Sequence, residues 1–359
     1  MTHFDQGLRQ RFHHVGKAAG LRVRQSFRGY EQDFHLPSVE PKTVAERRAC
    51  VKAISQARFT QGIATLRAAM TRQRSGQRLG QHFLVNPGWR KRIFETLPRG
   101  APETWVEIGA GHGEMTELLA ADSRRVIAIE TDPPLAAGLR ERARDWRSVE
   151  IVEGDVLALD VGKIAGGPFR VYGNLPYYIT SPILQRLFEC ADQISSIHIV
   201  IQLEVAARIA ARPGRRDYGY LSTLCQFYAH PEIAFRIPPG AFQPPPRVTS
   251  ALVQMTLPGE RASLGIADEK PFLEFLSTCF GQKRKTLRNN LRALASDERI
   301  HAALDASDLR RDSRGEQLSL AQFAAIFQTI AVSGQTDGHQ VRRRRQNQSR
   351  CEAGRENRS

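Results

Sequence analysis

The sequence predicts an α/β protein, with a doubly wound sheet domain followed by a small all-helical domain. Short apolar runs alternate with segments of helical periodicity between Thr104 and Arg212, and this alternation is typical of parallel strands joined by crossover helices. The first apolar run ends in a glycine-rich turn, and only helical spacing follows Pro258. These patterns favour one sheet domain and one helical domain.

Five apolar runs form the expected core strands, at Thr104–Gly109, Arg125–Glu130, Val149–Val152, Phe169–Tyr172 and Ile197–Gln202. Helical periodicity fills the segments between and after them, at Glu114–Ala121, Leu135–Arg144, Pro182–Cys190 and Glu204–Arg212. Two later strands are expected at Leu221–Tyr228 and Ala251–Leu257. Apolar residues three or four apart then predict helices at Pro271–Phe280, Arg284–Leu294 and Leu320–Ile330.

The length of 359 residues suggests two domains with extra segments at both ends. We expect the sheet domain at 76–257 and the helical domain at 258–331. The formal net charge of +15 belongs mostly to the ends, because residues 76–331 contain 31 basic and 29 acidic residues. Nucleic-acid binding by the body must therefore depend on local basic clusters.

Both ends of the chain are expected to be basic and disordered. Residues 1–75 contain 14 basic and 5 acidic residues without sustained periodicity, which predicts a disordered extension or a misassigned start upstream of Met70. An organelle transit peptide is the alternative, but such peptides are poor in acidic residues. Residues 332–359, with arginines at 342–345, predict a disordered basic tail.

Cysteine usage and hydropathy argue against two classes of protein. The five cysteines are far apart and include no CxxC pair, which disfavours a disulfide framework and a cysteine metal site. No run of about 18 apolar residues is present to span a membrane. The expectation is a cytoplasmic protein that uses no metal ion.

The glycine-rich turn after the first strand indicates a nucleoside site. Gly109 and Gly111 allow a ligand to approach the backbone at the start of a helix. The dinucleotide fingerprint would require glycine at 114, where a glutamate stands. Glu130 ends the next strand, where it can accept hydrogen bonds from ribose hydroxyls. Asp155 follows the third strand, where it can bind an adenine amino group.

Acidic residues at three successive strand ends, counting Glu107 before the turn, decide which nucleoside fits. Carboxylates would repel a pyrophosphate, so the site suits a ligand without phosphates. S-adenosylmethionine carries adenosine and a cationic sulfur and meets this requirement. The alternative is a turn that only packs strand against helix, with its acids in solvent.

The tetrapeptide from Asn174 to Tyr177 follows the fourth strand and predicts the catalytic centre. An exocyclic adenine amine is a weak nucleophile, because its lone pair is delocalised into the ring. The Asn174 side-chain oxygen and the Leu175 carbonyl can accept hydrogen bonds from its two N–H groups, while Pro176 holds that carbonyl rigid. Tyr177 offers a ring on which the base can stack. The alternative is an ordinary loop turn.

Five motifs between residues 76 and 330 form one recognisable combination. They are Gly80–Leu84 (GQHFL), Val106–Gly111 (VEIGAG), Gly173–Tyr177 (GNLPY), Phe242–Arg247 (FQPPPR) and Gln282–Asn289 (QKRKTLRN). The combination resembles the ribosomal RNA adenine N6,N6-dimethyltransferases, the family of the bacterial small-subunit dimethylase and its eukaryotic and mitochondrial relatives. The resemblance implies a Rossmann-like class I methyltransferase domain that uses S-adenosylmethionine, followed by the helical domain.

The resemblance also assigns roles to single residues. Those implied as cofactor contacts are His82, Leu84, Gly109, Gly111, Glu130, Asp155 and Asn174. Gly109 would lie against the methionine part, Glu130 on the ribose and Asp155 near the adenine. Asn174 would touch both the cofactor and the target amine, and Phe242 would cover the other face of the target base. The alternative for Phe242 is an aromatic side chain that fills the core. His82 and Tyr178 stand where the family often has asparagine.

The implied substrate is a pair of adjacent adenosines in the hairpin near the 3′ end of small-subunit (16S) rRNA. A monomeric enzyme would convert them to N6,N6-dimethyladenosine on an immature small subunit during ribosome biogenesis, after each base leaves its stack. Phosphate contacts are expected from an acid-free cluster comprising Lys283, Arg284, Lys285, Arg288 and Arg292. Helical spacing would place Lys285, Arg288 and Arg292 on one helix face. A second cluster comprises Arg208, Arg212, Arg215 and Arg216. For both clusters the alternative is a solvated face without RNA.

Two other functions compete with this interpretation. One is a 23S rRNA adenine N6-methyltransferase of the macrolide-resistance type, which has a similar cofactor core. The Gln282–Asn289 and Phe242–Arg247 motifs favour the small-subunit enzyme over it. The other is a ribosome-assembly factor that keeps the fold without the activity, against which the intact Asn174–Tyr177 motif argues.

Overall fold

The computed structural model describes residues 21–23, 34–36, 81–100 and 104–330. The chain divides into two compact units, Met1–Arg72 and Gln73–Ser359. In the first unit, strands β1 (Leu21–Val23) and β2 (Phe34–Leu36) form an antiparallel pair. The rest of the expected N-terminal extension and the expected C-terminal tail at 332–359 lie outside the described residues.

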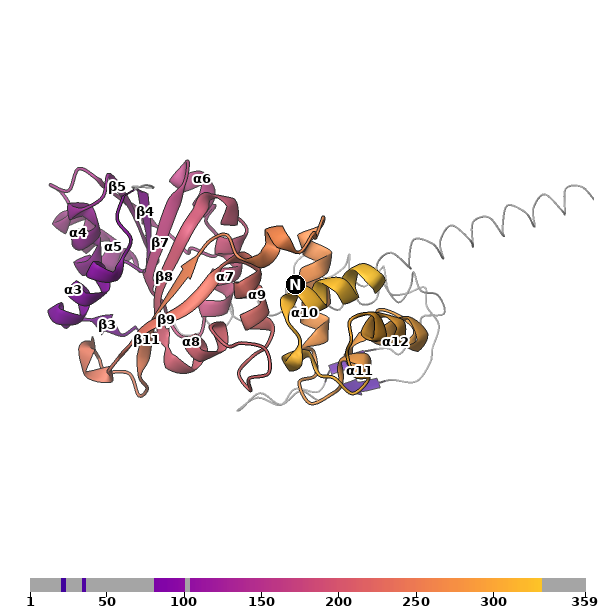
Figure 1. Cartoon of the computed structure of the whole chain (residues 1–359). Helices are drawn as coiled ribbons and strands as arrows, with labels where there is room; N and C mark the ends of the chain where they lie inside the picture. The colour runs from indigo at the N-terminus through magenta and orange to yellow at the C-terminus, as the bar shows by residue number, and fades with distance from the viewer. Residues whose placement is uncertain (1–20, 24–33, 37–80, 101–103, 331–359) are drawn as a thin grey trace, which may run out of the picture. The chain divides into compact units, whose positions relative to one another are not determined.

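A seven-stranded sheet, in the order β6-β5-β4-β7-β8-β11-β9, forms the centre of the second unit (Figure 1). Its strands are β4 (Thr104–Ile108), β5 (Arg125–Glu130), β6 (Val149–Glu153), β7 (Phe169–Asn174), β8 (Ile194–Gln202), β9 (His230–Ile237) and β11 (Ser250–Thr256). The first five strands of this order pair in parallel, and β11 is antiparallel to both β8 and β9. The five expected core strands and their parallel pairing are confirmed.

Helices cover both faces of the sheet, as doubly wound packing requires. On one face lie α3 (Pro87–Thr96), α4 (Glu114–Ala121) and α5 (Pro133–Arg142), which pack on Trp105, Val126 and Ala128. On the other lie α6 (Val161–Ala165), α7 (Thr180–Phe188), α8 (Leu203–Ile209) and α9 (Tyr220–Tyr228). Figure 1 shows the two layers on opposite sides of the strands.

The C-terminal part of the described chain is helical. It contains α10 (Glu269–Cys279), α11 (Leu287–Leu291), α12 (Asp297–Ala306) and a further helix at 320–330, and short 3-10 turns lie at Ala191–Gln193, Pro239–Ala241, Glu260–Ser263 and Gly315–Gln317. One hydrophobic cluster runs from the sheet through Phe227 and Phe272 to Phe323. The rings of Phe227 and Phe272 are 5.4 Å apart, so the helices share a continuous core with the sheet.

Two expected elements were wrong. Leu221–Tyr228 belongs to helix α9, because Leu221, Leu224, Cys225 and Tyr228 recur at helical spacing and pack in the core. The strand that pairs with β11 is instead β9, an edge strand whose residues are mostly exposed or half-buried and which therefore lacks an apolar run. The helix expected at Arg284–Leu294 is limited to α11, because the Thr286 hydroxyl caps it by accepting from the Asn289 amide.

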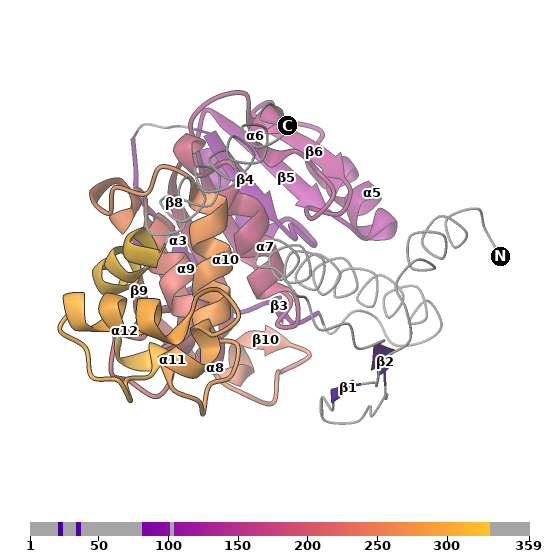
Figure 2. The same ribbon diagram turned by 90° about the vertical axis from the view of Figure 1, so that its right-hand side faces the viewer.

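A small second sheet joins two of the sequence motifs. Strand β3 (Phe83–Leu84) pairs antiparallel with β10 (Phe242–Gln243), with Leu84 opposite Phe242. Figure 2 shows the two strands side by side. The pairing brings the GQHFL and FQPPPR motifs together, although about 160 residues separate them.

No helix in the described part of the chain is long and apolar enough to cross a membrane.

Candidate active site

Four of the predicted site residues follow one another along a single edge of the sheet. Glu130 and Asn174 end β5 and β7, Gly109 directly follows β4, and Asp155 lies two residues beyond β6. Because β6, β5, β4 and β7 are parallel neighbours, their carboxyl ends meet at one edge, where ligands of open α/β sheets bind.

The glycine-rich turn is tied to the end of β5. Gly109 and Gly111 have φ values of 73° and 57°, the left-handed region that favours glycine. The Gly109 amide donates to the Ile129 carbonyl (2.8 Å), and the Gly111 amide donates to Glu130 Oε2 (2.8 Å). The other Glu130 oxygen accepts from the Asp132 amide (2.9 Å). Each oxygen keeps a second lone pair, so the fixed carboxylate can still accept from a ribose.

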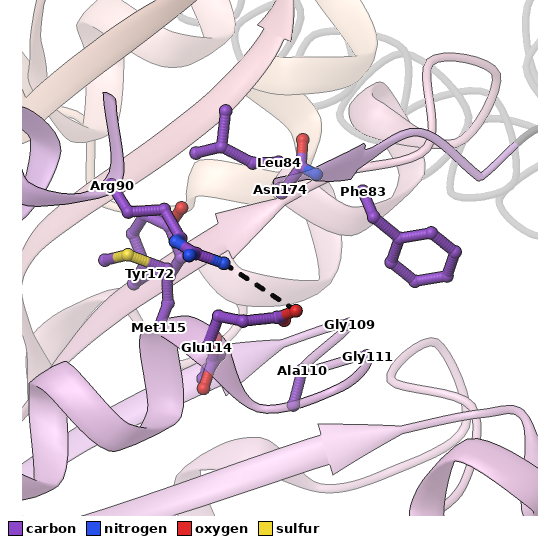
Figure 3. Close-up of a pocket in the computed structure, with 11 residues that line it drawn as sticks. Phe83, Leu84, Arg90, Gly109, Ala110, Gly111, Glu114, Met115, Tyr172 and Asn174 are labelled. Atoms are coloured by element: carbon purple, nitrogen blue, oxygen red, sulfur yellow. Dashed lines mark ion pairs between the residues drawn. The ribbon is translucent and has the colours of Figure 1, made fainter. Parts of the chain in front are cut away.

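A pocket opens beside this turn (Figure 3). It is lined by Phe83, Leu84, Arg90, Glu107, Gly109, Ala110, Gly111, Glu114, Met115, Tyr172 and Asn174. The structure therefore brings together four of the predicted cofactor contacts, Leu84, Gly109, Gly111 and Asn174. The other three, His82, Glu130 and Asp155, are not among its lining residues, and Asp155 caps the Leu157 amide (3.0 Å).

The orientation of the Asn174 amide is determined by its partner. Asn174 Nδ2 donates to the His82 carbonyl oxygen at 2.8 Å. A carbonyl can only accept, so the nitrogen must face His82 and Oδ1 must face away from it. The acceptor that the sequence predicted for the target amine is thus held in place. Within the described residues no hydrogen bond reaches the Leu175 carbonyl, the second predicted acceptor.

His82 links three motifs through its side chain. Its Nδ1 lies 2.7 Å from the Pro244 carbonyl oxygen, and its ring stacks on Tyr177 with centroids 5.6 Å apart. The Tyr177 hydroxyl lies 2.9 Å from Ser250 Oγ, and burial raises the pKa of this half-buried phenol. The His82 imidazole therefore contacts Pro244 and Tyr177 of the two motif loops, and its contact with a cofactor stays a prediction.

Phe242 and Tyr178 differ in their exposure. Phe242 is 3% exposed and packs in a cluster with Leu84 and Ile93, which matches the alternative of a core aromatic in this conformation. Its contact with a target base stays a prediction. Tyr178 is 46% exposed, and partial burial, together with the nearby Asp155 carboxylate, raises the pKa of its hydroxyl.

Two of the polar side chains that line the pocket, Glu107 and Tyr172, were not among the site residues predicted from the sequence, although Glu107 was counted among the acids at the strand ends. Glu107 is 2% exposed, and burial raises the pKa of its carboxyl to about 8, although Thr116 Oγ1 donates to Oε2 at 2.5 Å. Tyr172 is opposite Glu107 in the β4–β7 register and is 1% exposed. Its buried hydroxyl has no hydrogen-bond partner among the described residues. The acid before the glycine turn was a visible signal for Glu107, but nothing marked Tyr172.

The expected face of Lys285, Arg288 and Arg292 is not formed as predicted. Lys285 precedes the cap of α11, and both Arg288 and Arg292 donate to Asp297, at 2.8 and 3.1 Å to Oδ2. The Arg288 guanidinium first, and Arg292 with it, hold the pKa of Asp297 well below its usual range. The sequence could not show this, because Asp297 comes from the start of the next helix.

The remaining basic residues of the two clusters converge. Lys283 Nζ donates to the Arg216 carbonyl oxygen at 2.6 Å, which joins two exposed loops. Their free cations, which form no ion pair within the described residues, make up a surface that we call the basic loop pair: Arg212, Arg215, Arg216, Lys283, Arg284 and Lys285. Arg208 of the second cluster pairs with Glu204.

The chain is similar to known proteins over most of its length. The family model described as ribosomal RNA adenine dimethylase matches residues 72–332. Proteins named ribosomal RNA small subunit methyltransferase A are 42% identical over 267 residues in Koribacter versatilis and 44% over 256 residues in Acidobacterium capsulatum. These alignments cover 70% of this chain and 93% and 90% of the two relatives.

Two solved structures share the fold. A dimethyladenosine transferase from Plasmodium falciparum matches with a TM-score of 0.62 at 22% identity, covering 70% of this chain and 98% of that one. The 23S rRNA methyltransferase ErmE matches with a TM-score of 0.56 at 25% identity, covering 69% and 99%. The predicted class I methyltransferase fold is confirmed.

Proposed function

The chain belongs to the ribosomal RNA adenine dimethylase family, and from this premise we propose that it transfers methyl groups from S-adenosylmethionine to N6 of two adjacent adenosines in the 3′ hairpin of 16S rRNA. The product is N6,N6-dimethyladenosine. The observation that carries the proposal is the orientation of the Asn174 side chain at the end of β7, beside the glycine turn. Its Nδ2 donates to the His82 carbonyl, which directs the Asn174 Oδ1 away from His82.

The residues of the pocket fit such a donor. Tyr172 lines it together with the glycine turn and the carboxyl groups of Glu107 and Glu114. The buried Tyr172 hydroxyl has no hydrogen-bond partner among the described residues. Leu84, Gly109, Gly111 and Asn174 would hold the donor, with His82, Glu130 and Asp155 beside them. When bound, the sulfonium supplies an electrophilic methyl group.

The chain's own part in the reaction is to prepare the amine. In the first transfer, Asn174 Oδ1 and the Leu175 carbonyl accept hydrogen bonds from the two N–H groups of the amine, which localises the lone pair on nitrogen. In the second transfer the monomethylated amine has one N–H left to donate to this pair of acceptors. Tyr177 supports the ring of the base in both. Because these acceptor oxygens are not bases near neutral pH, they cannot take up the proton that the methylated amine loses after transfer, and that proton is released to water. Positioning of the amine against the methyl group then supplies most of the acceleration.

The basic loop pair supports rRNA as the substrate. Its six exposed cations are positioned to neutralise phosphates, which orient an RNA without reading its sequence. We place the reaction in the cytoplasm, on an immature small subunit and by a monomer, during ribosome biogenesis. Arg288 and Arg292 share one carboxylate and would contribute less to RNA binding than the cations of the basic loop pair.

The structural likeness to ErmE keeps a large-subunit substrate as the second candidate. The identity of more than 40% to small-subunit methyltransferases over most of their length favours the first. Purified small and large subunits that lack adenine dimethylation, offered separately with labelled donor, decide between them. We expect label in small-subunit rRNA, and label in large subunits alone would overturn the proposal. Loss of transfer in Asn174→Ala without loss of biological function would favour an assembly-factor role.

A further inference from the structure

Two opposite charges face each other across the pocket without a hydrogen bond. Arg90 on α3 and Glu114 on α4 are 3.7 Å apart between Nη1 and Oε1, and their side chains are 19% and 27% exposed. Figure 3 shows both side chains reaching toward one another from the two helices. The distance exceeds hydrogen-bond range, so the guanidinium N–H groups that face the pocket remain available to a third group.

Tyr172 adds a second indication of a ligand at the same place. Tyr172 lines the pocket, and its buried hydroxyl has no hydrogen-bond partner among the described residues. Leaving such a buried group unsatisfied destabilises the protein. A ligand atom that accepts from this hydroxyl would remove this destabilisation.

The position of the pocket identifies which part of a donor it would meet. The residues assigned to adenine and ribose, Asp155 and Glu130, do not line it, whereas Gly109 and Asn174 do. Along the sheet edge the order is Asp155, Glu130, Gly109 and Asn174. The pocket therefore lies at the end opposite the adenine, where the amino-acid part of the donor would be.

We infer that Arg90, Tyr172 and Glu114 form a subsite for the zwitterionic α-amino-acid end of the methyl donor, an inference that rests on the proposed function. The carboxylate would accept from the Arg90 guanidinium and the Tyr172 hydroxyl, and the ammonium would donate to Glu114. One cation and one anion on the protein match one anion and one cation on the ligand, so no charge is left unpaired.

Binding to the full chain, measured by calorimetry with two ligands, tests this subsite. S-adenosylhomocysteine carries the amino-acid end, and 5′-methylthioadenosine lacks it while keeping the nucleoside. Arg90→Met should weaken binding of S-adenosylhomocysteine about tenfold or more, the cost of a hydrogen bond to a charged group. Binding of 5′-methylthioadenosine should change less than about twofold.

Two further variants and a control refine the test. Tyr172→Phe should weaken S-adenosylhomocysteine binding by a smaller factor and spare 5′-methylthioadenosine. Arg90→Lys should retain part of the affinity, because the charge remains but the guanidinium fork is removed. Lys91→Met removes one positive charge from the same helix at an exposed site and should change neither affinity, and thermal unfolding verifies that each variant is folded.

The outcomes separate this inference from the proposed function. Equal losses for both ligands in Arg90→Met, or no loss for either, would overturn the subsite while the nucleoside site stands. Equal affinity of the unaltered chain for the two ligands would overturn it as well. Failure of the unaltered chain to bind either ligand would instead refute the proposed function.

Discussion

The sheet edge, which carries the predicted chemistry, and the basic loop pair, which is proposed to bind RNA, are built in different ways. At the edge, the carboxamide of Asn174 is held by a backbone carbonyl, and the carboxylate of Glu130 is held by two backbone amides. In the loops, cations are exposed, and Lys283 Nζ joins the two segments through the Arg216 carbonyl. The chemistry therefore depends on side chains that the backbone holds in place, whereas RNA affinity depends on charge that salt can screen.

The largest effect is expected from breaking the sheet edge at its catalytic acceptor. Asn174→Ala removes one preorganised acceptor, and groups of this kind contribute about 10²–10³ in rate. Single-turnover transfer to undimethylated small subunits measures it. Asn174→Asp is a second variant, which keeps acceptor oxygens but loses the N–H group that donates to the His82 carbonyl. Because its carboxylate would be repelled by that carbonyl oxygen, it should also be slow. Transfer at the original rate in Asn174→Ala would refute the role given to the carboxamide.

Burying the Glu107 carboxyl at the sheet edge should lower the free energy of unfolding in a pH-dependent way. An acid whose pKa is raised by folding destabilises the protein progressively between its unfolded value of about 4.3 and its folded value, by up to about 1.4 kcal/mol per pH unit. With a folded pKa of about 8, the penalty is absent below about pH 4 and complete above about pH 8. Glu107→Gln should therefore gain stability over the unaltered chain as the pH rises from about 5 to about 8. A constant difference in denaturant unfolding across this range would contradict it.

The basic loop pair should respond to salt where the edge does not. Replacing Lys283, Arg284 and Lys285 by alanine should weaken rRNA binding about tenfold or more near 0.1 M salt. The slope of log affinity against log salt concentration should also become shallower by nearly one for each phosphate that the variant no longer neutralises. The alanine pair at Arg288 and Arg292 is the matched control and should weaken binding less, because Asp297 already engages both side chains. Equal effects of the two sets would remove the distinction between free and paired cations.

The smallest effect is expected from His82, which couples the edge to the proline-rich loop. His82→Asn keeps the backbone carbonyl that holds Asn174 but removes the stack on Tyr177 and the hydrogen bond with Pro244. Loss of one side-chain hydrogen bond costs about 1 kcal/mol, so we expect a several-fold rise in KM for rRNA with little change in donor affinity. A loss confined to donor binding would instead support a side-chain contact with the cofactor.

Sequence reasoning worked best where local pattern and strand order coincide. The apolar runs that end at Gly109 and Glu130, and the run Phe169–Tyr172 that precedes Asn174, marked the strands. Because parallel pairing brings the carboxyl ends of neighbouring strands to one edge, these runs also predicted that the three residues lie along the same edge of the sheet, as the structure shows. Sequence reasoning failed where lateral neighbours matter. Tyr172 owes its place to being opposite Glu107 in the register, and Arg90 owes its place to the packing of α3 beside α4, and neither fact is written in a local pattern.

The errors in the helical region have the same cause. Leu221–Tyr228 was expected to be a strand, but its apolar residues fall on one face of helix α9 and pack in the core. Residues 283–292 contain no acid, but the start of α12 brings Asp297 against this segment, where it pairs with Arg288 and Arg292. Charge clusters in sequence therefore overestimate free charge wherever another element packs against them.

Nucleoside analysis of the 16S rRNA 3′ hairpin tests the central claim most directly. Undimethylated small subunits are incubated with the chain and donor, and the hairpin fragment is then isolated and digested for mass spectrometry. The account predicts N6,N6-dimethyladenosine at two adjacent positions, absent when Asn174→Ala replaces the unaltered chain. Unmodified adenosines in that hairpin, from subunits that a known dimethylase modifies under the same conditions, would contradict it.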